Sequence, residues 1–217
     1  MKIVNMSEHD SLLNNFIAEI RDVDIQRDPL RFRANIQRIG QVMAYEMSKT
    51  LKYRSMDVTT PLGVAPTRVI DDHIVVASIL RAGLPLHQGV LDVFDRAENC
   101  FVSAYRKYID ESHFDVHVEY LASPRIDGKT VVLCDPMLAT GSSMELAYRA
   151  ILKKGTPRKI VILSIVASRQ AVNYINEHIT EPNVEAWVAV IDPDLNEHAY
   201  IVPGIGDAGD LAFGEKE

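Results

Sequence analysis

The spacing of apolar residues predicts that the first part of the chain is helical. Apolar residues recur at helical intervals between Leu12 and Ile20, and again between Phe32 and Met43. Asp28-Pro29 is a typical helix start, with aspartate at the N-cap and proline at the first helical position. These features together predict a helical N-terminal segment over residues 1–52.

Beyond about residue 70 the pattern changes to short runs of Val and Ile that alternate with helical spacing. Strands are predicted at 73–80, 99–105, 129–135, 159–168 and 184–191, and helices at 84–94, 142–154 and 170–179. This alternation is typical of an α/β fold with a mostly parallel, twisted sheet flanked by helices. Ligands bind such sheets beyond the carboxyl ends of the strands, so we expect functional loops after residues 80, 105, 133 and 191.

One stretch alternates strictly between apolar and polar residues. Phe114, Val116, Val118 and Tyr120 alternate with aspartate, histidine and glutamate. That period is typical of a half-exposed strand, and we expect it to form a β hairpin or flap near residues 105–122.

Composition narrows the class of protein without giving its function. The chain has 217 residues, 47% of them hydrophobic and 24% charged, which predicts one globular domain over 1–217. The net charge of -7 makes a large nucleic-acid-binding face unexpected. No apolar run approaches the ~18 residues that span a bilayer, and the N-terminus lacks the apolar region of a signal peptide. Cys100 and Cys134 lie inside apolar runs, as buried free thiols do, so we expect a cytoplasmic protein without a membrane partner.

The segment from Asp135 to Ser143 combines a strand end, an acid, a loop of small residues and a helix start. The helix N-terminus directs free N–H groups and a positive dipole at whatever lies in front of it, which suits a phosphate. Asp135, just before the loop, can accept hydrogen bonds from sugar hydroxyls. The alternative is an ordinary strand-to-helix turn with serine at the N-cap, and the pattern alone leaves both interpretations open.

This segment resembles the phosphoribosyl-pyrophosphate (PRPP) loop of type I phosphoribosyltransferases. Its sequence, Asp135-Pro136-Met137-Leu138-Ala139-Thr140-Gly141-Ser142-Ser143, has the form found in the uracil-specific members. Residues 79–84 resemble that family's pyrophosphate loop, residues 200–210 resemble its C-terminal uracil-binding hood, and residues 60–63 are a weaker fourth match. The segments follow the family's order along the chain. The resemblance implies a core over 53–198 and a hood over 199–217.

The sequence departs from the family pattern in two places. Ser142 stands where the family's loop usually has glycine; serine keeps a backbone N–H, so phosphate binding is expected to survive with a changed loop geometry. The flap matches only through Tyr105-Arg106.

The resemblance implies a pyrimidine salvage reaction that joins uracil to PRPP and gives UMP and diphosphate. Arg106 and Asp207 are the implied catalytic residues. PRPP contacts are implied for Arg81, Arg106, Asp135, Pro136, Met137, Leu138, Ala139, Thr140, Gly141, Ser142, Ser143 and Asp207. Mg²⁺ is the implied cofactor, held mainly by PRPP with no direct protein ligand, as is usual for this ion. Without the resemblance, Arg81 is equally typical of a solvated surface arginine, and Arg106, with Lys107 beside it, is more typical of a solvated loop. Asp207 has the alternative of a turn residue, and Asp210 is more typical of one.

The same resemblance implies that the hood reads uracil. Ile201, Gly206 and Ala208 are the implied contacts through their backbone groups, with Asp207 beside them. Cytosine reverses two groups along the edge that is read, so it should be rejected. The hood is short of apolar residues, and we expect it to be exposed. It also lacks a cation from 201 to 214, which argues against orotate as the base.

The resemblance also implies partners for the chain, and two alternative functions are open. Some family members are activated by GTP, and the resemblance implies a homo-oligomer, either dimer or tetramer. An enzyme for another base, such as a purine, is one alternative. A regulator that binds nucleotides and RNA to control pyrimidine genes is another, and the acidic charge and intact hood argue against it.

Overall fold

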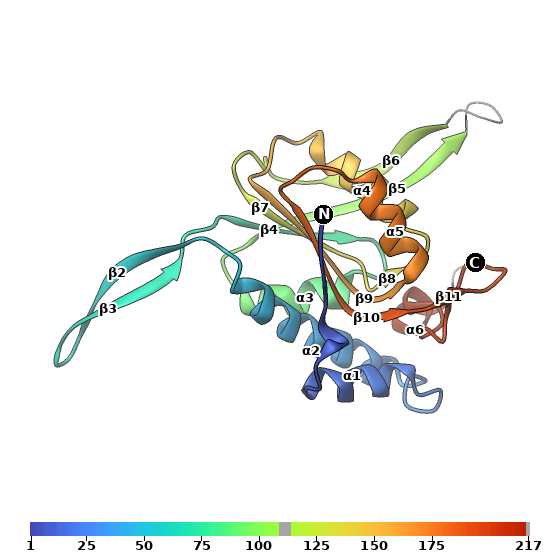
Figure 1. Cartoon of the computed structure of the whole chain (residues 1–217), viewed down its shortest axis with the longest axis horizontal. Coiled ribbons are helices and arrows are strands. Elements are labelled where there is room, and N and C mark those ends of the chain that lie inside the picture. The colour runs from blue at the N-terminus through green and yellow to red at the C-terminus, as the bar shows by residue number, and fades with distance from the viewer. Residues whose placement is uncertain (109–113, 216–217) are drawn as a thin grey trace.

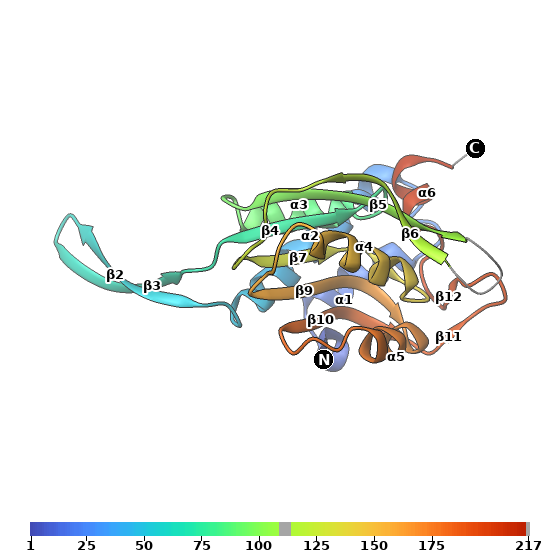
Figure 2. The ribbon, with the colours of Figure 1, turned by 90° about the horizontal axis from the view of Figure 1, so that it is seen from above.

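The central layer of the molecule is a twisted sheet whose strands come from most of the length of the chain (Figures 1 and 2). The computed structural model describes residues 1–108 and 114–215, with the side chains of residues 104–119 left out. Across the sheet the strands are β1 (Lys2–Asn5), β10 (Val184–Asp192), β9 (Lys159–Ser168), β7 (Thr130–Cys134), β4 (Ile74–Ile79), β5 (Glu98–Tyr108) and β6 (Phe114–Ala122), with β8 (Met137–Leu138) beside β9. All these pairings are parallel except that of β6 with β5.

Helices cover both faces of the sheet. One core cluster lies under α1 (Leu12–Arg21), α2 (Pro29–Ser48), α3 (Leu84–Val93) and α6 (Ala208–Phe213), and the other lies under α4 (Ser142–Leu152) and α5 (Arg169–His178). Successive strand residues point to opposite faces, so Val132 joins the first cluster and Val131 and Leu133 join the second. The predicted α/β class with a mostly parallel sheet is confirmed, and the predicted strands and helices lie within two or three residues of the observed ones.

The prediction of a helical N-terminal segment is only partly right. The two expected helices form, and the second begins as predicted: Asp28 accepts a hydrogen bond of 2.9 Å from the backbone N–H of Leu30, with Pro29 at the start of the helix. The chain nevertheless begins with β1 and a short 3₁₀ helix, η1 (Met6–Glu8). Val4 lies opposite Trp187 in the register of β1 and β10. Four residues are too few to show a period, and β1 is a strand because the edge of β10 is there to pair with it.

A second hairpin, β2 (Tyr53–Thr60) with β3 (Gly63–Ile70), was not expected from the sequence. It projects away from the body of the molecule (Figure 1) and pairs from Tyr53 opposite Ile70 to Thr60 opposite Gly63. Most of its residues are exposed, including Leu62 at 100%. Because neither face of the hairpin is buried in this chain, no alternation of apolar and polar residues marks it.

The expected flap is present as backbone. β5 and β6 form an antiparallel pair with a register shift between Ser103 and Ala104, and Arg106 lies opposite Val116. The tip of the flap, residues 109–113, lies outside the described residues, as does the side chain of Arg106.

After β10 the chain turns back over the sheet's carboxyl edge to form the hood. β11 (Asp194–Leu195) pairs with β12 (Ile201–Val202), and α6 follows. Cys100 and Cys134 are buried free cysteines, as expected. Within residues 1–108 and 114–215, no helix is both long and apolar enough to cross a membrane.

Candidate active site

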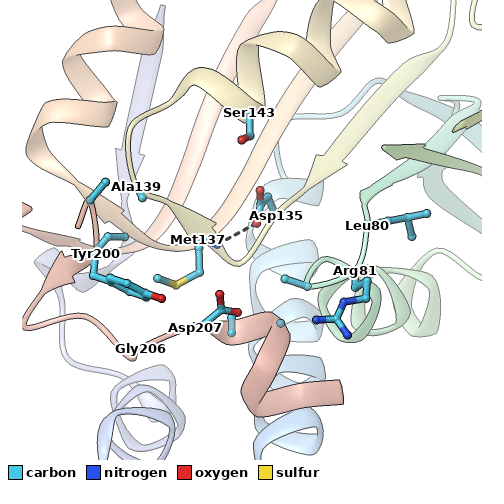
Figure 3. A pocket seen from close by; sticks show the side chains of 14 residues that line it. Leu80, Arg81, Asp135, Met137, Ala139, Ser143, Tyr200, Gly206 and Asp207 are labelled. Atoms are coloured by element: carbon cyan, nitrogen blue, oxygen red, sulfur yellow. Dashed lines mark hydrogen bonds between the residues drawn. The ribbon is translucent and has the colours of Figure 1, made fainter. Parts of the chain in front are cut away.

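A cavity of about 310 Å³ lies between the carboxyl edge of the sheet and the hood (Figure 3). Its walls come from the ends of β4 and β7, from the loop before α4 and from the hood. The lining residues are Leu80, Arg81, Ala82, Asp135, Met137, Ala139, Ser143, Ala199, Tyr200, Ile201, Gly206, Asp207, Ala208 and Gly209. The fold therefore brings together the three segments that the sequence singled out.

Asp135 lies at the inner wall of the cavity, directly after β7. The backbone N–H of Met137 donates to its Oδ1 atom at 3.1 Å (Figure 3). The residue is 9% exposed, and burial raises the pKa of its carboxyl to about 7, against the smaller lowering effect of that hydrogen bond. A carboxyl so placed has unused acceptor capacity facing the cavity.

The loop before α4 is tightly constrained at Gly141. Its φ of 86° is left-handed, and a Cβ atom there would lie 2.7 Å from Cδ1 of Tyr174. The Thr140 and Ser142 hydroxyls are 2.9 Å apart, so the side chain of the unusual Ser142 turns back onto the loop. Ala139 and Ser143 face the cavity from either end of this turn. The N-terminus of α4 is thereby aimed at the cavity, as the phosphate-binding interpretation requires.

Arg81 follows β4 and stands at the rim of the cavity. Its Nη2 atom is 3.1 Å from Oδ1 of Asp210, and both terminal nitrogens lie 3.4 Å from the carbonyl oxygen of Gly214. The side chain is 38% exposed. Asp210, taken from the sequence as a turn residue, therefore links the loop after β4 to the hood.

Asp207 lies on the hood side of the cavity, between Met137 and Arg81 in Figure 3. It is also the N-cap of α6 and accepts a hydrogen bond of 2.9 Å from the backbone N–H of Asp210. The expectation of an exposed hood was wrong: Ile205, Ala208 and Ala212 are at most 3% exposed and belong to a core cluster. Few apolar residues suffice because the hood packs onto a core supplied by other elements.

The residues expected to read a base also lie at the cavity. Ile201 is in β12, Gly206 has a φ of 85°, and Ala208 is the first residue of α6. All three line the cavity, so their backbone groups are near any ligand within it.

The sequence interpretation placed Tyr200 in the hood but gave it no contact. Its ring is 44% exposed and flanks the cavity on the side of Ala139 (Figure 3). The turn before it is held by Asn196, whose Oδ1 accepts from the backbone N–H of Tyr200 at 2.9 Å, and Ala199 adopts a φ of 61°. A tyrosine at the start of the hood was visible in the sequence, but only the turn shows that it faces the site.

Some residues that were predicted to contact PRPP lie outside the cavity lining. Among the described residues, Pro136, Leu138, Thr140, Gly141 and Ser142 do not line the cavity and set the course of the loop instead. The side chain of Arg106 lies outside the described residues, so its predicted contact stays a prediction.

The oxygen donors of the cavity suit a hard cation that also binds oxygen atoms of a ligand. Asp135 and Asp207 present carboxylate oxygens to the same cavity. Among residues 1–108 and 114–215 no group of three or more His, Cys, Asp or Glu could hold a metal ion by itself. Such a site fits Mg²⁺, which usually keeps oxygen ligands from a phosphate substrate.

Comparison with known proteins finds the same family over nearly the whole chain. A family model described as uracil phosphoribosyltransferase matches residues 7–215. A uracil phosphoribosyltransferase of Porphyromonas gingivalis is 58% identical over 216 residues, which is 100% of both chains. One of Methanothermobacter thermautotrophicus is 41% identical over 189 residues, covering 86% of this chain and 85% of the relative.

Solved structures show the same fold. The AQ2163 protein from Aquifex aeolicus superposes with a TM-score of 0.83 at 31% sequence identity, and the match covers 98% of each chain. The TT1426 protein from Thermus thermophilus gives a TM-score of 0.53 at 19% identity, covering 84% of this chain and 90% of its own. The second likeness concerns the fold alone.

Proposed function

The chain belongs to the uracil phosphoribosyltransferase family, and we propose that the cavity between the sheet and the hood is its active site. The enzyme is a pentosyltransferase of pyrimidine salvage that converts uracil and PRPP to UMP and diphosphate. The observation that carries the proposed site is the convergence of Asp135, Arg81 and Asp207 on one cavity from three separate segments.

The 5′-phosphate of PRPP is assigned to the loop from Ala139 to Ser143, in front of α4. Gly141 supports this, because as the N-cap of α4 it offers no capping side chain that would compete with a phosphate for the first N–H groups of the helix. Asp135 is assigned to the ribose hydroxyls, where its carboxylate accepts hydrogen bonds. Pro136, Met137 and Leu138 carry the chain between these two contacts, with Met137 at the cavity wall.

Arg81 and Arg106 are assigned to the leaving diphosphate. Bond breaking at ribose C1 builds positive charge on the sugar and negative charge on the departing group. A guanidinium beside that group stabilises the transition state more than the ground state. Arg81 is supported by its place at the rim, 3.1 Å from Asp210. Arg106 is supported by the flap backbone, which reaches past the sheet's carboxyl edge (Figure 1).

Uracil is assigned to the backbone of Ile201, Gly206 and Ala208, with Asp207 between the base and the ribose. Met137 and the Tyr200 ring offer apolar surface to a flat base. The hood thus fixes the nitrogen nucleophile in line with C1, and the catalytic gain comes mainly from this positioning.

Mg²⁺ is proposed as the cofactor, held mainly by PRPP, and Asp207 is the hood residue whose carboxylate would face it. When bound, it neutralises charge on diphosphate and ribose oxygens. The two carboxyl groups that line the cavity, those of Asp135 and Asp207, support this.

A homo-oligomer is supported by the β2–β3 hairpin. A two-stranded hairpin is marginally stable alone, and this one exposes Met56, Leu62 and Val64 far from the rest of the chain. A second copy that covered these residues would stabilise it. Whether the assembly is a dimer or a tetramer is a question for light scattering.

Three further assignments concern activation, location and domain organisation. Activation by GTP rests on the family resemblance, and adding GTP to the assay tests it. A cytoplasmic location is supported by the two buried free cysteines. The division into residues 1–52, 53–198 and 199–217 is proposed as a division of one domain, since α6 packs onto α2.

The decisive experiment is a panel of bases with PRPP and Mg²⁺, followed by diphosphate release. Uracil should react, while cytosine, hypoxanthine and orotate should not. Comparable turnover of cytosine or hypoxanthine would refute the assignment of the hood. Binding of pyrimidine leader RNA without any turnover would favour the regulator instead.

A further inference from the structure

The hood is held at Gly204 by two side chains from distant parts of the chain. The Arg21 Nη1 atom donates to the carbonyl oxygen of Gly204 at 2.9 Å. The backbone N–H of Gly204 donates to Oδ2 of Asp192, also at 2.9 Å. Both backbone groups of Gly204 are therefore bound by this pair.

The two side chains are also bound to each other. Arg21 Nη1 and Nη2 reach Oδ2 and Oδ1 of Asp192 at 2.9 and 2.7 Å, a two-pronged ion pair. The side chains are only 23% and 6% exposed. Paired guanidinium and carboxylate groups of this geometry fix direction as well as distance, so Gly204 is held in a defined orientation.

The turn at Gly204 transmits its position to its neighbours. Gly204 has a φ of 59°, and a Cβ atom there would lie 2.1 Å from the carbonyl oxygen of Ile201. Ile201 and Gly206 stand on either side of this turn and line the cavity. A movement of Gly204 would therefore move the backbone groups of Ile201 and Gly206 relative to a bound ligand.

We propose that Arg21 and Asp192 are positioning residues for the uracil subsite, a role that rests on the proposed function of the hood. Neither is among the residues that line the cavity. They set the height and angle of the backbone that reads the base, while the assigned PRPP contacts other than Asp207 come from other elements. Arg21 is the last residue of α1, whose buried Leu13, Ile17 and Ile20 anchor it to the core.

A purely structural ion pair is the alternative, and the chain contains a matched control. Arg31 makes a similar two-pronged pair with Glu19, at 2.7 and 2.8 Å, and joins α2 to α1. It contacts no residue of the hood in any described hydrogen bond or ion pair. Arg31→Met therefore removes a pair of the same geometry, although a more exposed one, without touching Gly204.

The experiment compares Arg21→Met, Arg21→Lys and Arg31→Met in the full chain. We expect Arg21→Met to raise KM for uracil roughly tenfold or more, since small misplacements near the reacting atoms are costly. KM for PRPP should rise much less, because all its assigned contacts except Asp207 come from elements that do not touch Gly204. Arg21→Lys keeps the charge but not the two-pronged geometry, so it should fold and raise KM for uracil in the same direction. Arg31→Met should change the melting temperature and leave KM for uracil unaltered.

Each failure has a distinct signature. Wild-type protein that does not convert uracil would refute the proposed function of the hood. Active wild-type protein, with KM for uracil unchanged in both Arg21 variants, would overturn the positioning role alone. The same rise in KM for uracil in Arg31→Met would show that any loss of packing around α1 has this effect, and would overturn it as well.

Discussion

The carboxylate of Asp207 accepts a hydrogen bond of 2.9 Å from the backbone N–H of Asp210, and the same side chain lines the cavity. One residue thus caps α6 and is available to the ribose or its Mg²⁺. The two roles can be separated, because a cap needs only a side-chain oxygen, whereas the proposed catalytic role needs a charge.

Asp207→Ala should lower kcat/KM by about 10²-fold or more and destabilise the protein by roughly 1 kcal/mol, the usual cost of a lost N-cap. Asp207→Ser keeps a capping oxygen, so it should melt near the wild-type temperature and remain as inactive as the alanine variant. Thermal melting with steady-state kinetics checks both. Near-normal kinetics in Asp207→Ser would remove the carboxylate from the site.

Gly141→Ala should raise KM for PRPP, because the new Cβ would lie 2.7 Å from Tyr174 and displace the loop that we assign to the 5′-phosphate. Gly128→Ala is the control: its φ of 70° is similarly left-handed, but no atom lies within 4 Å of the added Cβ. Both variants should lose ~1–2 kcal/mol of stability from the left-handed backbone. An equal rise in KM for PRPP in both would show that contact with Tyr174 is irrelevant to the loop.

Asp135 should make the free protein less stable as pH rises. Burial raises the pKa of its carboxyl to about 7 in the folded state, from 3.8. Between these values the unfolded chain has released the proton and the folded chain retains it, so stability falls with rising pH through this window. In the Asp135→Asn variant the side-chain amide oxygen still accepts a hydrogen bond from the backbone N–H of Met137, but the side chain does not titrate.

Melting curves at pH 4 and pH 8 test this. The melting temperature of the variant, relative to that of wild type, should be several degrees higher at pH 8 than at pH 4. One pKa unit corresponds to about 1.4 kcal/mol, and about 1 kcal/mol moves Tm by ~2–4 °C at this size. A difference in melting temperature that stays constant between the two pH values would contradict the raised pKa.

Arg81→Ala should lower kcat at saturating substrates by about 10²-fold, as removal of one donor to developing negative charge does. Asp210→Ala is its control, because it breaks the 3.1 Å ion pair and keeps the guanidinium at the rim. That variant should retain most of the activity. If Asp210→Ala is as inactive as Arg81→Ala, the ion pair is what matters, and Arg81 acts by holding the hood.

Arg106→Ala should reduce kcat by roughly 10²-fold or more. It should weaken uracil binding by less than this. Arg125→Ala removes an exposed arginine paired with Asp127 on the loop before β7, and it should have no kinetic effect. An unchanged turnover number in Arg106→Ala would show that Arg106 is a solvated surface residue.

The central sheet was predictable because buried strands leave a strong pattern. β9 is apolar along most of its length and was predicted to the residue, whereas β1 and the β2–β3 hairpin were missed. A strand of four residues shows no period, and a hairpin with both faces exposed carries no alternation. Their structure depends on what they pair with, not on their own sequence pattern.

The cavity lining was predictable where one segment supplies several of its residues, as from Asp135 to Ser143. It was not predictable where the cavity is shaped by contacts between distant segments. Nothing in the sequence joins Arg21 to Gly204, or Arg81 to Asp210, because these pairs are separated by 183 and 129 positions. Packing of the hood onto the core, not the composition of the hood, determines which of its residues face the cavity.

The pairing of β1 with β10 has a consequence for synthesis on the ribosome. Lys2–Asn5 find their partners only when Glu185–Val188 have emerged, and Arg21 waits still longer for Gly204. Lys2–Asn5 and Arg21 therefore remain without these particular partners while the strands between them are translated. Such distant contacts slow folding, and vectorial synthesis delays them further. A nascent chain stalled before residue 184 should leave its N-terminal strand open to protease, and one extended past the hood should protect it.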